Sequence, residues 1–263
     1  RMCPSCQRRR SLKVYHQIKK ICNYIVAEKP TVSFMMLTLT VPNVHRCDLP
    51  ETIKHMMSSY HRLFRRSEVK KGILGWFRSL EVTKQKNKDD FYHPHFHVLI
   101  AVRPSYFSTN YINQKRWLTL WQESTRQPEI TQVDIRKIKP NRKGIRSGEL
   151  SLNAEGGSSQ ASISGAAAEV GKYATKPSDY IKKDMNDNYY ADPDTVNTLA
   201  ACLHGTRLIA FGGLLKEVKE LLLLEDAESE STDLVNVGDD IEKLDAVMRQ
   251  VFKWNYFNRL YIN

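Results

Sequence analysis

Three histidines alternate with other residues in the run His93-Pro94-His95-Phe96-His97-Val98-Leu99-Ile100, which constrains the fold more than any other segment of the chain. A period of two is that of a β-strand, whose successive side chains point to opposite faces of a sheet. The three imidazoles therefore share one face, and Phe96, Val98 and Ile100 point to the other. Adjacent imidazoles on one face form half of a metal site, because neutral nitrogen donors converge there without backbone strain.

An acidic partner for these histidines lies on the preceding predicted strand, Ile73–Thr83. A polar stretch would join the two strands as a hairpin and place Glu81 opposite the histidines. Glu81 is the only carboxylate on its strand, and an acid among apolar residues is favoured where a cation accompanies it. We therefore expect His95, His97 and Glu81 to hold a metal ion. The alternative is that the histidines lie in solvent at a strand end and that Glu81 is an exposed edge residue.

Helical and strand patterns mix along the whole chain. The spacing of apolar residues predicts helices at residues 11–27, from Asp48 and Pro50 to about Phe64, at Thr109–Glu123, and from about Ser164 to a break at Pro177. Strands are expected at residues 32–41, 73–83, 95–102 and 130–139. Strands mixed with helices, including a hairpin, predict an α+β fold in which helices flank a central, mainly antiparallel sheet.

We expect three segments along the chain: a basic helical segment with cysteines at residues 1–30, a body at 31–183 that carries the predicted metal ligands, and an acidic, mainly helical region at 184–263. Residues 140–162 are rich in Gly, Ser and polar side chains, so they are predicted to be a loop or linker. In the last segment, residues 194–224 are helical in character with a break at Gly212-Gly213, and 251–262 are predicted to form a final strand.

The charge of the chain is unevenly distributed. Its formal net charge is +11, but residues 1–183 carry 33 basic and 14 acidic side chains, whereas residues 184–263 carry 7 and 15. A basic body of this kind is typical of proteins that bind nucleic acid, since Lys and Arg that neutralise phosphates release counterions. The alternative is a solvated surface of basic helix faces. No apolar run approaches 18 residues, so no membrane partner is expected.

The cysteines argue against a secreted, disulfide-bonded protein. There are five, an odd number, and they are spread thinly, which favours a reducing cytoplasm. Cys3 and Cys6 form a Cys-x-x-Cys pair, which is half of a tetrahedral zinc site. The remaining ligands would come from Cys22, Cys47, His16 or His45, or from upstream residues, which we expect because the sequence opens at Arg1 rather than Met. The alternative to structural zinc is that the pair are plain buried thiols.

A second group of chemically active residues is Glu169, Lys172, Tyr173 and Lys176, whose spacings of three and four predict one shared helical face. A phenol is a poor nucleophile in water, but lysines on both sides and a metal-bound phosphate would stabilise it as the phenolate. Glu169 would then act as a base for water or accept a proton from a leaving group. The alternative is an exposed helix with ordinary salt bridges.

These elements occur in an order that resembles the three motifs of HUH endonucleases: the strand Phe34–Val41 with Pro42-Asn43, then His95-Phe96-His97, then Glu169-Val170-Gly171-Lys172-Tyr173. More narrowly, the chain resembles the replication initiators of bacterial rolling-circle plasmids that have one nucleophilic tyrosine with a glutamate four residues before it. The resemblance also covers Cys3 to Ser11, Ser79 to Thr83, and Leu203 to Gly213.

The resemblance implies that residues 31–183 are an HUH nuclease domain, which nicks a plasmid double-strand origin. Tyr173 would attack the scissile phosphate, keep the 5′-phosphate as a phosphotyrosine ester and release a 3′-OH, with Lys172 beside it. His95, His97 and Glu81 would hold Mg²⁺ or Mn²⁺, and Glu169 would permit termination by cleavage and strand transfer. Tyr180 is a rival nucleophile that lies beyond Pro177.

The partners implied are origin DNA, as a single-stranded or hairpin nick site and a duplex binding site, host helicase and replication proteins, and a second copy in a homodimer. Two alternatives stay open: another HUH enzyme, such as a relaxase or a transposase, and a non-catalytic binder of nucleic acid. In the binder, basic helices and aromatic residues such as Trp76, Phe91 and Tyr92 would hold strands by stacking.

Overall fold

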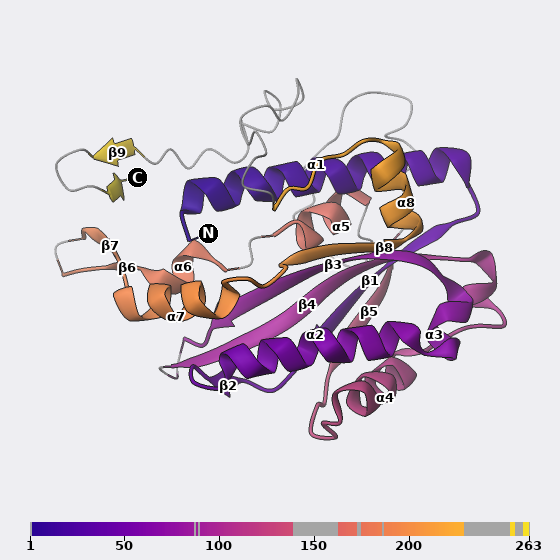
Figure 1. The fold of residues 1–263 in the computed structure, drawn as a ribbon, viewed down its shortest axis with the longest axis horizontal. Helices are drawn as coiled ribbons and strands as arrows, with labels where there is room; N and C mark the ends of the chain where they lie inside the picture. Colours follow the sequence, from indigo (N-terminus) through magenta and orange to yellow (C-terminus); the bar gives the residue numbers. More distant parts are fainter. Residues whose placement is uncertain are drawn as a thin grey trace.

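A six-stranded antiparallel sheet forms the centre of the molecule (Figure 1). The computed structural model describes residues 2–86, 88, 90–138, 163–172, 175–185, 187–228, 253–255 and 260–262. The sheet has the order β5-β1-β4-β3-β8, and β2 pairs with β4. Its strands are β1 (Ser33–Thr40), β2 (Val44–His45), β3 (Ile73–Lys84), β4 (Phe91–Val102), β5 (Val133–Ile138) and β8 (Ile209–Gly213).

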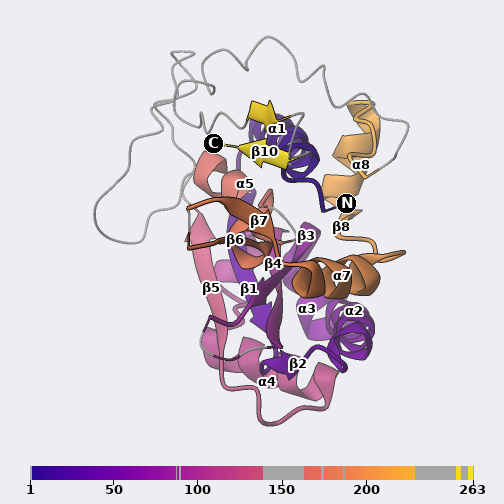
Figure 2. The same cartoon turned by 90° about the vertical axis from the view of Figure 1, so that its left-hand side faces the viewer.

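Helices cover both faces of this sheet, as the two views show (Figures 1 and 2). One face carries α1 (Pro4–Glu28), α5 (Ile163–Val170) and α8 (Leu214–Leu221). The other carries α2 (Leu49–Arg65), α4 (Gln114–Thr125) and α7 (Pro193–Leu203). Shorter elements are α3 (Ser67–Gly72), a 3₁₀ turn (Pro104–Phe107), α6 (Pro177–Tyr180) and two hairpins, β6 (Ile181–Lys183) with β7 (Tyr189–Ala191) and β9 (Lys253–Asn255) with β10 (Leu260–Ile262). The predicted α+β class, with helices flanking an antiparallel sheet, is confirmed.

Alternation along the strands builds an apolar core on each face. In β1, Met35, Leu37 and Leu39 pack beneath α2 and α4, whereas Phe34 and Met36 pack beneath α1. Successive side chains of a strand point to opposite faces, and helices cover both faces of this sheet. Almost every side chain of a central strand is therefore buried, which is why these strands contain so few charged residues.

The expected helices and strands are largely confirmed, with shifts at their ends. The first helix begins at Pro4 rather than near residue 11, with proline in its first turn, where the missing N–H costs nothing. The fourth helix begins at Gln114 rather than Thr109, because the side chain of Asn113 accepts a hydrogen bond from the backbone N–H of Arg116 and caps it there. The final segment forms two short paired strands instead of one. The predicted loop at residues 140–162 lies outside the described residues.

The sequence predicts that residues 194–224 are helical with a break at Gly212-Gly213. The helical expectation is wrong at residues 209–211, because Ile209–Gly213 form the edge strand β8 beside β3. Gly213 then turns the chain into α8 with φ of 55°, a left-handed conformation that glycine adopts without strain. A Cβ at Gly213 would also lie 2.4 Å from the carbonyl oxygen of Leu74. Both α1 and β8 lie outside residues 31–183 and yet belong to the central layers. The proposed division into three segments stays a prediction.

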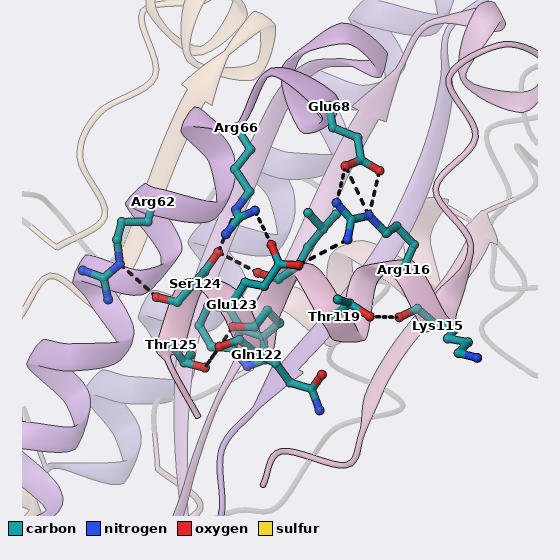
Figure 3. Close-up of polar contacts among 12 residues, drawn as sticks. Arg62, Arg66, Glu68, Lys115, Arg116, Thr119, Gln122, Glu123, Ser124 and Thr125 are labelled. Atoms are coloured by element: carbon teal, nitrogen blue, oxygen red, sulfur yellow. Dashed lines mark hydrogen bonds and ion pairs between the residues drawn. The ribbon is translucent and has the colours of Figure 1, made fainter. Parts of the chain in front are cut away.

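Arginines fix α4 against α2 and α3 (Figure 3). Arg116 of α4 holds Glu68 of α3 with a closest contact of 2.7 Å, and Arg66, just after α2, pairs with Glu123 of α4. Arg62 donates to the backbone carbonyl of Ser124 at 2.9 Å. Because arginine presents several donors in a rigid fork, these contacts set the angle between the helices rather than only their distance.

A buried carboxylate ties the β6–β7 hairpin and α7 to the end of β3. Asp192 Oδ2 lies 2.7 Å from Lys182 Nζ and 3.4 Å from Lys84 Nζ, and Thr195 donates to it at 2.7 Å. The hydrogen bond from Lys182 is the main cause that holds the pKa of Asp192 well below its usual range. The folded state therefore favours the ionised form of this side chain.

We expect Asp192→Asn to lower the free energy of unfolding by about 1 to 2 kcal/mol at pH 7, since hydrogen bonds to a buried charge are lost. A lowered folded pKa contributes stability that is complete above the unfolded pKa of about 4 and is lost as the pH falls towards the folded pKa. The difference from wild type should therefore shrink below about pH 4 in urea titrations. Asp187→Asn, which removes an exposed pair with Lys183, is the matched control and should change nothing measurable. An equal loss of stability in both variants would contradict the assignment.

Candidate metal centre

The hairpin of β3 and β4 brings the predicted ligands together. In its register Glu81 lies opposite His95, and Ser79 lies opposite His97. Phe96, Val98 and Ile100 face the α2 side, as predicted from alternation, so the histidines and Glu81 lie on the face covered by α1 and α5.

The three side chains converge closely. Glu81 Oε2 lies 3.0 Å from His97 Nε2 and 3.3 Å from His95 Nε2. One ligand atom from each residue fits within 4.8 Å of the other two. Glu81 is only 3% exposed. Within the described part of the chain, this is the one group of three or more His, Cys, Asp or Glu side chains with such geometry. The three side chains lie together as predicted, and their binding of a metal ion stays a prediction.

A hydrogen bond on the far side of the His95 ring favours a cation at the centre. His95 Nδ1 lies 3.2 Å from the backbone carbonyl oxygen of His93, and a carbonyl only accepts, so Nδ1 carries the proton. In the neutral ring, Nε2 then presents a lone pair to Glu81 Oε2 at 3.3 Å. Two acceptors so close need a proton or a metal ion between them. The donor set of two imidazoles and one carboxylate suits a divalent cation.

Glu81 also contacts a lysine. The Nζ of Lys176 lies 3.0 Å from Glu81 Oε1. Burial alone would raise the pKa of Glu81, but where a proton rather than a metal ion lies between the rings and the carboxylate, hydrogen bonds from His95 and His97, together with Lys176, hold that pKa far below its usual range. The carboxylate in turn raises the pKa of Lys176 against the effect of burial. Both groups are therefore charged at neutral pH. The contact between Lys176 and Glu81 was not anticipated from the sequence.

The glutamate of the second group also reaches this centre. Glu169 lies at the end of α5, its Oε1 is 3.9 Å from His97 Nε2, and its other oxygen pairs with Lys172. The expectation of one helical face is wrong, however, because α5 ends at Val170. A Cβ at Gly171 would lie 2.8 Å from the carbonyl oxygen of Ala167 in α5 and 3.4 Å from the α1 backbone at Ser11 and Tyr15. Both lysines nevertheless lie at the centre, because Lys172 pairs with Glu169 and Lys176 pairs with Glu81. Tyr173 lies outside the described residues.

The remaining predicted residues lie beside the centre or away from it. His93 stacks against His95, with ring centroids 5.2 Å apart, and burial lowers the pKa of its imidazole, but it is not part of the ligand group. Tyr180 is 2% exposed and its hydroxyl donates to the backbone carbonyl of Met2. It packs in the core on the α2 side of the sheet, which disfavours it as the nucleophile. Thr38 of β1, opposite His97, has its hydroxyl 3.5 Å from His97 Nδ1 and was missed; its period-two spacing with Thr40 is the signal that could have found it.

The Cys3 and Cys6 thiols interact with each other at the start of α1. Burial acts to raise the pKa of Cys3, but hydrogen bonds from the backbone N–H and the thiol of Cys6 lower it, whereas the hydrogen bond between the two thiols raises the pKa of Cys6. Among the residues that the structure describes, no third His, Cys, Asp or Glu gathers with them. Both are partly exposed rather than buried, unlike Cys22. Structural zinc at this pair stays a prediction.

The sequence profile of a family described as "Replication protein" matches residues 1–262. The chain belongs to this replication protein family of rolling-circle plasmids. Among the relatives of this replication protein, "Protein rep" of Streptococcus pneumoniae serotype 2 (strain D39 / NCTC 7466) is 36% identical over 258 residues, which cover 97% of this chain and 72% of the relative. "Protein rep" of Lactiplantibacillus plantarum is 36% identical over 267 residues, covering 99% and 78%. "Replication protein" of Staphylococcus aureus is 31% identical over 248 residues, covering 93% and 96%.

No solved structure matches the replication protein described here. In the described segments, none of its helices combines the length and the apolar character that crossing a membrane requires.

Proposed function

We propose that this replication protein is a metal-dependent endonuclease and strand transferase that nicks the double-strand origin of its plasmid at one site on one strand, through a 5′-phosphotyrosine on Tyr173. The observation that carries the proposal is the cluster of Glu81, His95 and His97 with Glu169 beside it. Glu169 and Lys176, which flank Tyr173 in the sequence, lie beside this cluster, and a divalent cation site near a tyrosine is what phosphoryl transfer to that tyrosine needs.

The residues present fit a divalent ion such as Mg²⁺ or Mn²⁺. Glu81, His95 and His97 would hold it, leaving the open coordination positions to phosphate oxygens. When bound, such an ion polarises the phosphoryl oxygens and neutralises their developing charge.

The chain's own residues carry the nick itself. The phenol oxygen of Tyr173 forms a bond to phosphorus as the bond from phosphorus to the 3′ oxygen breaks, and the phenol proton is balanced by the proton gained at the 3′ oxygen. Lys172, already beside Glu169, and Lys176, beside Glu81, stabilise the phenolate by their positive charge. The product is a 5′-phosphotyrosine ester and a free 3′-OH that primes synthesis.

The uneven charge supports DNA as the substrate. Residues 1–183, which include the whole cluster, carry 33 basic and 14 acidic side chains, so they attract a polyanion. Host replication proteins, a helicase among them, would then use the nicked origin, and a second copy of the chain in a homodimer would serve the paired nick and binding sites. A cytoplasmic location accords with free thiols and a plasmid substrate.

Ending the replication cycle needs a second attack on phosphorus. We propose that water makes this attack and that Glu169 is its general base. Its carboxylate lies at the cluster but is 41% exposed as a side chain, so it can accept a proton from an incoming water. The water oxygen bonds to phosphorus, the tyrosine leaves as phenol, and the proton passes through Glu169. Strand transfer follows the same course with a DNA 3′-OH in place of water.

We expect Glu169→Gln to keep nicking and adduct formation while hydrolytic release of the adduct falls about 100-fold, the usual size of a general-base contribution. Single-turnover assays on an origin oligonucleotide, with separate counts of adduct and released product, measure both steps. Glu220→Gln is the matched control, because Glu220 is also a helical glutamate paired with a lysine, and it lies away from the site. If Glu169→Gln binds metal normally but fails to nick, Glu169 acts in the first step instead.

The proposal as a whole is tested by incubating the protein with supercoiled DNA that carries candidate origins, with Mn²⁺ or Mg²⁺, and mapping the nick. One nick at a fixed position on one strand, with protein attached at the 5′ end and no cleavage in chelator, is the expected result. Tight binding without cleavage under all metal conditions would instead indicate a non-catalytic DNA-binding protein.

A further inference from the structure

Helix α1 makes side-chain hydrogen bonds to the chain on both sides of Tyr173. On the C-terminal side, Gln7 Nε2 donates to the hydroxyl of Thr175 at 3.0 Å. Gln7 is 8% exposed and Thr175 is completely buried. A hydrogen bond between two buried polar side chains holds its partners strongly, because each would otherwise be left without water.

On the N-terminal side, the hydroxyl of Ser11 donates to the backbone carbonyl of Gly171. Gly171 also lies against the α1 backbone, since a Cβ there would be 3.4 Å from the carbonyl oxygen of Ser11 and from the N–H nitrogen of Tyr15. Gln7 and Ser11 are four residues apart on one helix, so they project from the same face of α1. That face of α1 therefore holds two residues of the segment that follows α5, Gly171 and Thr175.

Near each of these two residues, a neighbour in the sequence lies beside the metal centre. Glu169, two residues before Gly171, has Oε1 3.9 Å from His97 Nε2, and Lys176, next to Thr175, lies 3.0 Å from Glu81. In the sequence, Tyr173 is the middle one of the three residues between Gly171 and Thr175, the two residues that α1 holds.

We propose that Gln7 and Ser11 of α1 are positioning residues for the attack by Tyr173, because they hold the described residues on both sides of it beside the metal centre. This inference rests on the proposed role of Tyr173 as nucleophile. The side chains of α1 contact the turn rather than the reacting atoms, so their effect lies in the geometry of attack. A misplacement of about 1 Å at a reacting group can reduce the rate about 100-fold.

Four variants of the whole chain separate positioning from simple packing. Gln7→Leu and Thr175→Val each remove one partner with little change of volume, and Thr175→Ser keeps the hydroxyl. Gln17→Leu is the matched control, because Gln17 is also a buried α1 glutamine, but its Nε2 donates to the backbone carbonyl of Glu225 at 2.8 Å, away from the turn. A double variant, Gln7→Leu with Thr175→Val, leaves neither partner unpaired.

The main measurement is the single-turnover rate of adduct formation on an origin oligonucleotide at saturating protein and Mn²⁺. We expect Gln7→Leu and Thr175→Val each to lower this rate 10- to 100-fold, with oligonucleotide and Mn²⁺ affinities within about threefold of wild type. Thr175→Ser and Gln17→Leu should stay within about threefold of the wild-type rate. The double variant should be no slower than the slower single variant, because both substitutions remove the same contact.

Amide hydrogen exchange tests the contact without relying on chemistry. In Gln7→Leu, the peptide that spans residues 171–176 should exchange at least about tenfold faster, while Gln17→Leu should leave it unchanged. Wild-type adduct rates and unchanged exchange in Gln7→Leu and Thr175→Val would overturn the positioning role. An equal loss in Gln17→Leu would also overturn it, since α1 would then act only through overall stability. If wild type forms no adduct but exchange responds as expected, the proposed nucleophile fails and the contact of α1 with the turn stands.

Discussion

Replacing Tyr173 by phenylalanine should abolish the covalent adduct with an origin oligonucleotide while leaving noncovalent binding intact. The substitution removes only the attacking oxygen, so the basic surface and the metal ligands stay as they are. Loss of a nucleophile from a catalytic group lowers the rate by at least about a thousandfold, which puts the adduct below detection. Adduct is measured as a shifted protein band on denaturing gels, and binding by fluorescence anisotropy of the same oligonucleotide.

Tyr180→Phe is the matched control for this prediction. Tyr180 is seven residues further along, its hydroxyl donates to the backbone of Met2, and it packs on the opposite side of the sheet from Glu81. We expect this variant to form the adduct at close to the wild-type rate, with a small loss of thermal stability. An adduct that persists in Tyr173→Phe and disappears in Tyr180→Phe would transfer the role of nucleophile to Tyr180.

The second large effect should come from the ligands of the metal centre. We expect His97→Ala and Glu81→Gln each to lower Mn²⁺-dependent cleavage about 100-fold or more, because a bound cation contributes several kcal/mol to the transition state and 1.4 kcal/mol is tenfold in rate. Thermal unfolding with and without Mn²⁺ gives an independent measurement. An ion that binds only the folded state raises the melting temperature of the wild type, and this increase should vanish in both variants.

His93→Ala is the matched control for the ligands, since His93 lies on the same strand face but outside the ligand group. It should keep both the Mn²⁺-induced rise in melting temperature and most of the cleavage. Cleavage at the full rate in the presence of chelator, or equal losses in His93→Ala and His97→Ala, would contradict a centre made of Glu81, His95 and His97.

Local pattern was sufficient for the part of the site that lies on one hairpin. A period of two set the face of His95 and His97, and pairing of adjacent strands placed Glu81 opposite them. The central strands and the long helices followed from the same kind of argument, because their apolar periodicity is strong. The family resemblance likewise depended on motifs that are each continuous in sequence.

Tertiary packing decided what lies outside such patterns. Ile209–Gly213 joins the sheet as β8 although its neighbours are helical, because the exposed edge of β3 offers it backbone partners and a short apolar run suits either state. Spacing predicted one helical face from Glu169 to Lys176, but α5 ends at Val170, and Gly171 then lies against the backbone of α1.

The remaining contacts of the site join segments that are far apart in the chain. Lys176 meets Glu81, and Gln7 meets Thr175, across separations for which spacing in the sequence has no rule. Sequence by itself determined the two strands, the three candidate ligands and the basic character of the body. Only the packing of the sheet and its two helix layers decided that Lys176 contacts the buried carboxylate of Glu81. The same packing decided that α1 holds the residues on either side of Tyr173. The physical reason is that periodicity reports the face that a side chain occupies, whereas the partner on that face depends on how distant elements pack.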